Sequence, residues 1–94
     1  MVGFYVIRSM KPKNIERAQE RREEKKKFAS KIGKHLRKIR ESKDISQENL
    51  SLAAGYYRTY VGKIEMGNYS PSMHTIWRLS HTLGMSLEDF FKGF

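Results

Sequence analysis

Residues 46–65 read SQENLSLAAGYYRTYVGKIE, and this stretch decides the fold of the chain. Ser46 stands directly before a run of helix-forming residues, where a serine hydroxyl can cap the first free backbone amides of a helix. Gly55 ends that helix, because glycine readily adopts the left-handed backbone conformation found at helix C-termini. A second helix is predicted over residues 57–66. The stretch therefore predicts two short helices joined by a tight turn.

The pattern on the N-terminal side of this stretch predicts a further helix. From Phe28 onward, apolar residues recur at spacings of three and four, as on the face that a helix buries. This apolar stripe consists of Ala29, Ile32, Leu36 and Ile39. The dipeptide Asp44-Ile45 breaks the pattern and ends the helix.

Two more helices are predicted on the C-terminal side. Ser72 is placed to cap the first of them and Gly84 to end it. Its apolar stripe consists of Met73, Ile76, Leu79 and Leu83. Ser86, with Asp89 three residues later, resembles a capping box that opens a short final helix. Five short helices without a convincing core strand predict a compact all-α domain over residues 28–94.

Length and composition limit the classes of protein to consider. The chain has 94 residues, which suit one small domain and a tail, and its 38% of hydrophobic residues suffice for a modest core. The absence of cysteine excludes a disulfide scaffold and a thiolate metal site, and is compatible with the cytoplasmic location that we expect. The longest apolar run near the N-terminus covers only residues 2–7, far short of the roughly 20 that a membrane span needs.

Charge is distributed unevenly along the chain, whose net charge is +9. Residues 1–43 carry 15 basic and 5 acidic side chains, a net charge of +10, whereas residues 44–94 carry 4 basic and 5 acidic ones, a net charge of −1. Such asymmetry in a small basic protein favours a polyanionic partner, either nucleic acid or an anionic membrane surface. A domain with a merely solvated charged leader is the alternative.

The N-terminal leader has two parts. Residues 1–13 form a tail with a short β-prone run over residues 4–7, for which a pairing strand and a disordered segment are the alternatives. Residues 14–27 read NIERAQERREEKKK, nearly all of them helix formers. They are too poor in apolar residues to bury a face, so we expect a charged, solvated helix that extends the next helix backwards. An arm that contacts phosphates is the functional alternative.

Helical geometry divides the predicted helix over residues 57–66 into two sides. At about 100° per residue, one arc of about 140° holds the polar side, which comprises Arg58, Thr59, Gly62, Lys63 and Met66. The opposite side is centred on Tyr57, Val61 and Ile64, with Tyr60 near the boundary. Gly62 costs about 1 kcal/mol of helix propensity relative to alanine, which either a close approach to another surface or a tolerated imperfection explains. We expect the polar side to project outward while the apolar side packs on the core.

Motifs spread through all five predicted helices match a known family. They are Leu36 and Arg40; Ser46-Gln47-Glu48 with Leu50; Ala54-Gly55; Arg58-Thr59-Tyr60-Val61; Ile64-Glu65 and Gly67; Ser70-Pro71-Ser72; and Leu83-Gly84-Met85-Ser86-Leu87. On these motifs, residues 32–91 resemble the lambda-repressor-like helix-turn-helix family of the Cro/C1 or Xre type. Residues 58–61 with residues 64–65 are also similar to the controller proteins of restriction–modification systems, which implies control of restriction–modification genes and of its own gene.

The resemblance implies a sequence-specific, DNA-binding transcriptional regulator whose third helix enters the major groove. At matching positions, the residues that would read base edges are Arg58, Thr59 and Lys63. Those that would contact phosphates are Gln47, Tyr57, Tyr60 and Asn68. Arg40 and Glu65 match positions that form an ion pair and orient the third helix. The family usually has Ser, Thr or Asp as the N-cap of this helix, where the present chain has Tyr57; either its ring packs inward or its hydroxyl reaches the DNA backbone.

The C-terminal end carries more large apolar side chains than a small domain hides easily. They are Leu87, Phe90, Phe91 and Phe94. We predict that they form the interface of a two-fold homodimer, with extra core packing as the alternative. The family often dimerises through this end, which would set two recognition helices roughly 34 Å apart on palindromic double-stranded DNA.

Other chemistry has little support in the sequence. His35, His74 and His81 lack the spacing and the accompanying carboxylates of a metal site, and no phosphate-binding loop or catalytic constellation appears. We therefore expect no enzymatic activity, no metal, no cofactor and no small-molecule ligand. Two further functions are alternatives: an antitoxin-like module of the same fold that binds a protein, and a non-specific nucleic-acid binder driven by the leader.

Overall fold

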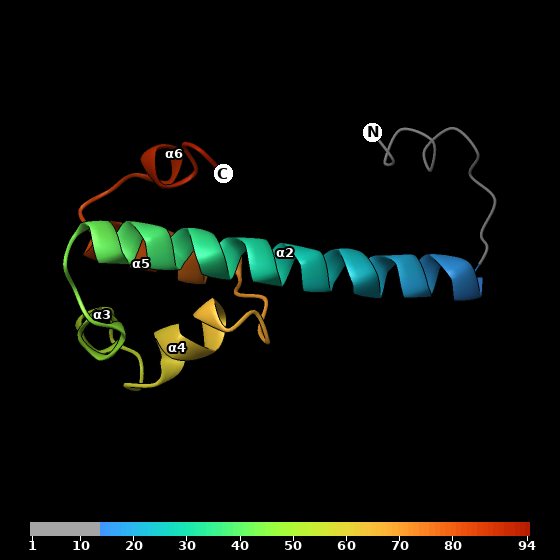
Figure 1. Cartoon of the computed structure of the whole chain (residues 1–94), viewed down its shortest axis with the longest axis horizontal. Helices are drawn as coiled ribbons and strands as arrows, with labels where there is room; N and C mark the ends of the chain where they lie inside the picture. Colours follow the sequence, from blue (N-terminus) through green and yellow to red (C-terminus); the bar gives the residue numbers. More distant parts are fainter. Residues whose placement is uncertain (1–13) are drawn as a thin grey trace.

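The computed structural model describes residues 14–94, which form five α-helices (Figure 1). They are α2 (Asn14–Ser42), α3 (Gln47–Ala53), α4 (Tyr60–Glu65), α5 (Met73–Thr82) and α6 (Leu87–Phe90). Residues 14–94 contain no strand, and the predicted all-α class is confirmed. The strand or disordered tail predicted for residues 1–13 lies outside the described residues.

The charged extension and the first helix of the domain are one continuous helix, α2, of 29 residues. At 1.5 Å per residue, α2 is about 43 Å long. Its C-terminal half crosses the other helices, whereas its N-terminal half runs past them (Figure 1). Nearly all side chains between residues 15 and 28 are exposed, and Ala29 is the first that is buried. No helix within residues 14–94 is both long and apolar enough to cross a lipid bilayer.

Serine side chains begin three of the other helices. The Oγ atoms of Ser46, Ser72 and Ser86 each accept a hydrogen bond from the backbone N–H three residues later, at 3.0, 3.1 and 3.0 Å. Each bond satisfies an amide that has no partner within its helix. These three predicted caps are confirmed, so local sequence determines where α3, α5 and α6 begin.

The hydrophobic core lies where α2, α3, α4 and α5 meet, and α6 closes it. The apolar side chains that are buried there include Ile32, Leu36, Leu50, Ala54, Val61, Ile64, Ile76, Leu79, Leu83 and Phe90. α2 packs against α4, α3 packs against both α4 and α5, and α5 packs against α6. In Figure 1, α3 and α4 lie on one side of α2 and α6 lies on the other. The helix α4 is therefore held by its contacts with α2 and α3, and the rest of the surface of α4 faces away from the core.

Gly33 allows α2 to approach α4 closely. A Cβ atom on residue 33 would overlap the carbonyl oxygen of Ile64 and lie 3.1 Å from Cα of Glu65. Both are backbone atoms of α4, so they cannot move aside unless the helix itself shifts. Gly33 thus sets the spacing between α2 and α4. This role could not be predicted from the apolar residues of α2.

The third helix is shorter than the helix predicted over residues 57–66. In the structure, Arg58 and Thr59 precede α4, and Thr59 is its N-cap residue without a side-chain capping hydrogen bond. The backbone N–H of Tyr60 donates to the carbonyl oxygen of Tyr57 at 3.0 Å and closes a turn there. The prediction was wrong for these first residues, because a wheel drawn from sequence assumes that the helix is already formed.

Candidate nucleic-acid interface

Ser51 fixes the beginning of α4 against α3. Its buried hydroxyl accepts a hydrogen bond from the backbone N–H of Val61 at 3.0 Å and donates one to the carbonyl oxygen of Gln47 at 2.8 Å. One side chain therefore satisfies an amide in the first turn of α4, which has no partner within that helix. We did not predict this role; the available signal was a serine next to the apolar Leu50 in a short helix.

Arg40 and Glu65 form a buried ion pair between α2 and the end of α4. Arg40 Nε donates to Glu65 Oε2 at 2.7 Å and Nη2 donates to Oε1 at 3.0 Å, while Nη1 donates to the carbonyl oxygen of Ile45 at 2.8 Å. The side chains are only 10% and 2% exposed. The hydrogen bonds to Glu65 raise the pKa of Arg40 above its ordinary value. The pair is held by two parallel bonds and fixes the orientation of α4.

Gln47 joins the same cluster from the first turn of α3. Its Nε2 donates to Glu65 Oε1 at 2.9 Å. A Cβ atom on Gly62 would lie 3.2 Å from Gln47 Oε1, so the close approach that Gly62 permits is to a side chain of the same chain. Gln47 is therefore positioned between α3 and α4, and its second amide hydrogen points to no partner within residues 14–94.

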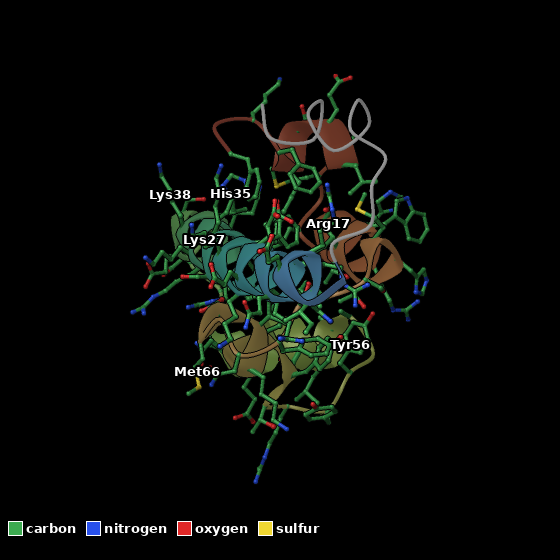
Figure 2. All side chains as sticks on the ribbon, turned by 90° about the vertical axis from the view of Figure 1, so that its right-hand side faces the viewer. Arg17, Lys27, His35, Lys38, Tyr56 and Met66 are labelled. Carbon is green, nitrogen blue, oxygen red and sulfur yellow. The ribbon has the colours of Figure 1, made fainter. Side chains whose placement is uncertain are left out.

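The polar edge of α4 and the turn before it are open to solvent. The exposed side chains there are Arg58, Thr59, Lys63, Met66 and Asn68. Lys63 lies on α4, whereas Arg58 and Thr59 lie in the turn that leads into it. Lys63 Nζ is 5.1 Å from the ring centroid of Tyr57, in cation–π contact. Figure 2 shows Met66 on the side of α4 that is turned away from α2.

A cluster of tyrosines lies beside this edge. The rings of Tyr56 and Tyr57 contact that of Tyr60, with centroids 4.3 and 5.3 Å away. The Tyr60 hydroxyl hydrogen-bonds to the hydroxyls of Tyr69 at 3.0 Å and Thr75 at 3.3 Å. Burial raises the pKa of Tyr60 to about 12. Tyr60, which was predicted to contact a phosphate, is mostly packed inside, and its hydroxyl already has two partners within the chain.

The exposed members of the tyrosine cluster are Tyr57 and Tyr69, at 53% and 41% exposure. Tyr57 therefore does not pack its ring inward, which was one of the two alternatives for this residue. Tyr69 was not predicted as a site residue. Its hydroxyl is hydrogen-bonded to that of the buried Tyr60.

The C-terminal aromatic residues divide between core and surface. Phe90 is fully buried, and its carbonyl oxygen is hydrogen-bonded to Nε2 of His35 on α2. Its predicted place in a dimer interface is wrong, because α2 covers it within the same chain. Leu87, Phe91 and Phe94 are half-buried and pack against the core. Phe28, which is 40% exposed, contacts Phe94 edge-on with centroids 6.1 Å apart.

The histidines serve packing roles. His35 lies between the rings of Phe90 and Phe94, with centroids 5.1 and 5.2 Å away. His74 and His81 lie on either side of the exposed Trp77 on α5, with centroids 6.1 and 4.2 Å away. Within residues 14–94, no group of three or more His, Cys, Asp or Glu side chains is placed to hold a metal ion.

Comparison with known proteins places this architecture in a family. The family profile described as helix-turn-helix matches residues 36–90, more than half of the chain. The chain belongs to this helix-turn-helix family, and the resemblance to its Xre type is confirmed.

Relatives and one solved structure agree with this assignment. The SPbeta prophage-derived uncharacterized HTH-type transcriptional regulator YonR of Bacillus subtilis is 38% identical over 62 residues, which are 66% of this chain and 57% of YonR. The chain thus spans little more than half the length of that relative. Control protein C.MunI of a Mycoplasma species is 34% identical over 62 residues, which are 65% of this chain and 84% of C.MunI. The crystal structure of the restriction-modification controller protein C.AhdI from Aeromonas hydrophila superposes with a TM-score of 0.66 at 33% identity, covering 70% of this chain and 96% of C.AhdI.

Proposed function

We propose that this chain is a DNA-binding transcriptional regulator that binds a palindromic site as a homodimer, with α4 in the major groove. The observation that carries the proposal is an exposed polar edge on a firmly held short helix. Arg40, Glu65 and Ser51 anchor α4 by hydrogen bonds from two neighbouring helices, while the edge itself stays open to solvent. Base readout needs such anchoring, because it depends on the geometry of hydrogen bonds.

The residues that read bases are Arg58, Thr59 and Lys63. A guanidinium can donate two hydrogen bonds to O6 and N7 of guanine, a lysine can donate to the same atoms, and a threonine offers a hydroxyl and a methyl group that fits against thymine. All three side chains are exposed. Because Arg58 and Thr59 lie in the turn before α4, they meet the groove at the N-terminal end of the helix, and Lys63 follows one turn later.

The phosphate contacts come from the rim of this surface. Gln47 offers its second amide hydrogen from the start of α3, where free backbone amides also favour an anion. Tyr57 and Asn68 are exposed on either side of Lys63. We add Tyr69 in place of the buried Tyr60, because Tyr69 is exposed and its hydroxyl is hydrogen-bonded to that of Tyr60.

The dimer interface is formed by Leu87, Phe91, Phe94 and Phe28. These side chains leave an apolar surface beside α6 after the core is closed. α6 lies across α2 from α4 (Figure 1), so pairing there leaves the polar edge of α4 free for DNA. A two-fold dimer then presents two copies of α4 to one face of a palindromic site.

A narrower role, the control of restriction–modification genes including its own, is favoured by two of the proteins that the chain is similar to. The chain matches 84% of C.MunI and 96% of C.AhdI, both named as control proteins, but only 57% of YonR. A reporter gene placed behind the promoter of this protein's own gene tests the role, which requires that expression change when the protein is supplied.

Arg58→Ala tests the proposed binding mode. We expect the variant to bind a selected duplex about 1–3 kcal/mol more weakly and to lose its preference at one base position. Fluorescence anisotropy with the selected duplex and with single-base variants of it measures both effects. Lys38→Ala, which removes one exposed positive charge from the flank of α2 away from α4 (Figure 2), is the matched control and should bind like the unaltered protein. Equal affinity and equal base preference for Arg58→Ala and Lys38→Ala would contradict the assignment.

A further inference from the structure

We infer that the N-terminal half of α2 is a second DNA-contacting element, in which Arg22, Lys25 and Lys26 hold phosphates of the backbone that flanks the bases read by α4. The inference rests on the proposed function. It assigns a ligand, the sugar–phosphate backbone, to a part of the chain that precedes the residues matched by the helix-turn-helix profile.

The three cations line one groove together with the turn between α4 and α5. Across from them, the groove is lined by Gly67, Asn68 and Ser70. Asn68 also lines the hollow beside α4 that Tyr57 and Lys63 border. The groove on α2 and the surface proposed to bind DNA are therefore continuous through Asn68.

The turn lies directly against α2 at this groove. Gly67 has a positive φ of 79°, and a Cβ atom there would lie 3.1 Å from Cα of Ser30. The absence of a side chain on Gly67 therefore lets the turn pack closely on the backbone of α2. The position of the three cations relative to Asn68 is thus set by two packed backbone segments rather than by flexible side chains.

The three groove cations and the acidic residues lie on different faces of the N-terminal half of α2. At about 100° per residue, Arg22, Lys25 and Lys26 fall within one arc of about 100°. The acidic residues fall within another arc of about 100°, centred about 160° away; they are Glu16, Glu20, Glu23 and Glu24. The basic face is the one that continues into Ala29 and Gly33, and hence the one on the side of α4. The segment therefore has one face that carries the three cations without a carboxylate, whereas its opposite face combines the four carboxylates with Lys27.

These cations are exposed and have no carboxylate partner within residues 14–94. All three side chains are open to solvent. The ion pairs of this part of the chain join Arg37 to Glu41, Arg40 to Glu65 and Lys92 to Asp89. Three neighbouring positive charges without internal compensation attract a polyanion, and arginine and lysine are the usual donors to phosphate oxygens.

The position of the groove selects the flanking backbone as its occupant. α2 runs out past the other helices at its N-terminal half (Figure 1), and the groove lies at the end of α4 where Gly67 follows the helix. Phosphates that reach this groove therefore belong to the backbone next to the bases under α4. Such contacts add affinity without base specificity.

The test compares two triple variants of the full chain. Arg22→Gln/Lys25→Gln/Lys26→Gln empties the groove of charge. Lys27→Gln/Lys34→Gln/Lys38→Gln removes the same net charge from exposed positions on the opposite face of α2. Both change only exposed side chains, and circular dichroism melts check that each is folded.

We expect the groove variant to bind the selected duplex about 10-fold or more weakly. The slope of log K against log salt concentration should become shallower by up to about 5, since each lost phosphate contact removes about 0.9 and each copy in the dimer loses three. The preference for the selected site over an unrelated duplex should be unchanged. For the opposite-face variant we expect less than about a twofold loss and a slope change below about 1. Equal affinities and slopes for the two variants would overturn the inference.

A length series with the unaltered protein gives a second measurement that needs no variant. Duplexes that end at the edges of the selected site are compared with duplexes that extend it by several base pairs on each side. The extended duplexes should bind about 10-fold more tightly to the unaltered protein and no more tightly to the groove variant. If extension does not change the affinity of the unaltered protein while the selected site is still preferred, the inference fails and the proposed function stands. If no duplex is preferred at all, both fail.

Discussion

At the scale of single residues, two helical glycines in this chain have opposite surroundings. The space beside Gly33 is occupied by the backbone of α4, whereas the space beside Gly62 is occupied by the end of the Gln47 side chain. We expect Gly33→Ala to lower the free energy of unfolding by about 1–3 kcal/mol or more, because α2 and α4 must separate. Gly62→Ala should be close to neutral, since the helix propensity that it gains, up to about 1 kcal/mol, offsets a small shift of Gln47.

Urea unfolding of both variants, followed by circular dichroism, measures the difference. Gly62→Ala serves as the control, because it makes the same chemical change in α4, the helix that packs against α2, at a position that faces only the Gln47 side chain. A Gly33→Ala variant as stable as Gly62→Ala would show that α2 and α4 are not as close as described.

At the scale of elements, α3 and α4 begin in different ways. The Ser46 hydroxyl caps α3, while Thr59 precedes α4 without a side-chain hydrogen bond to it. We expect Ser46→Ala to lower the free energy of unfolding by about 1 kcal/mol, and Thr59→Ala to change it by less than about 0.5 kcal/mol. Thermal melts of the two variants measure this difference. A larger loss of stability for Thr59→Ala than for Ser46→Ala would contradict the prediction.

The same contrast explains how much of the structure the sequence could predict. The beginnings of α3, α5 and α6 depend on a serine and the backbone amide three residues later, so neighbouring residues in the sequence were enough to predict them. The beginning of α4 depends on the Ser51 hydroxyl of α3, which accepts from the backbone N–H of Val61 ten positions later, and that is a tertiary contact.

The candidate site shows the same limit. The contact between Arg40 and Glu65, which are 25 positions apart, could be predicted only because both residues match a family pattern. Neither the close approach at Gly33 nor the burial of Ser51 follows from apolar spacing. The apolar content of the C-terminal end was plain from sequence, but which aromatic residue turns inward depends on where α2 lies, and it is Phe90.

At the scale of the whole molecule, binding to a palindromic site requires a dimer that pairs on the side away from α4. Light scattering at micromolar concentration should give twice the 11.1 kDa mass of the chain. Phe28→Glu places a charge on the half-exposed ring beside Phe94 and should shift the mass to that of one chain, because a charge buried in an apolar interface is costly. Met73→Glu, at a position on α5 that is 61% exposed, is the control and should remain dimeric. If the unaltered protein has the mass of a single chain, the proposed dimer is contradicted.

The claim on which the rest depends is that the exposed edge of α4 reads base pairs, and selection of bound sites from random duplexes tests it most directly. We expect enrichment of one sequence with two-fold symmetry, whose half-site centres lie about 34 Å apart along the duplex. Recovery of duplexes with no sequence in common, at every salt concentration tried, would contradict it.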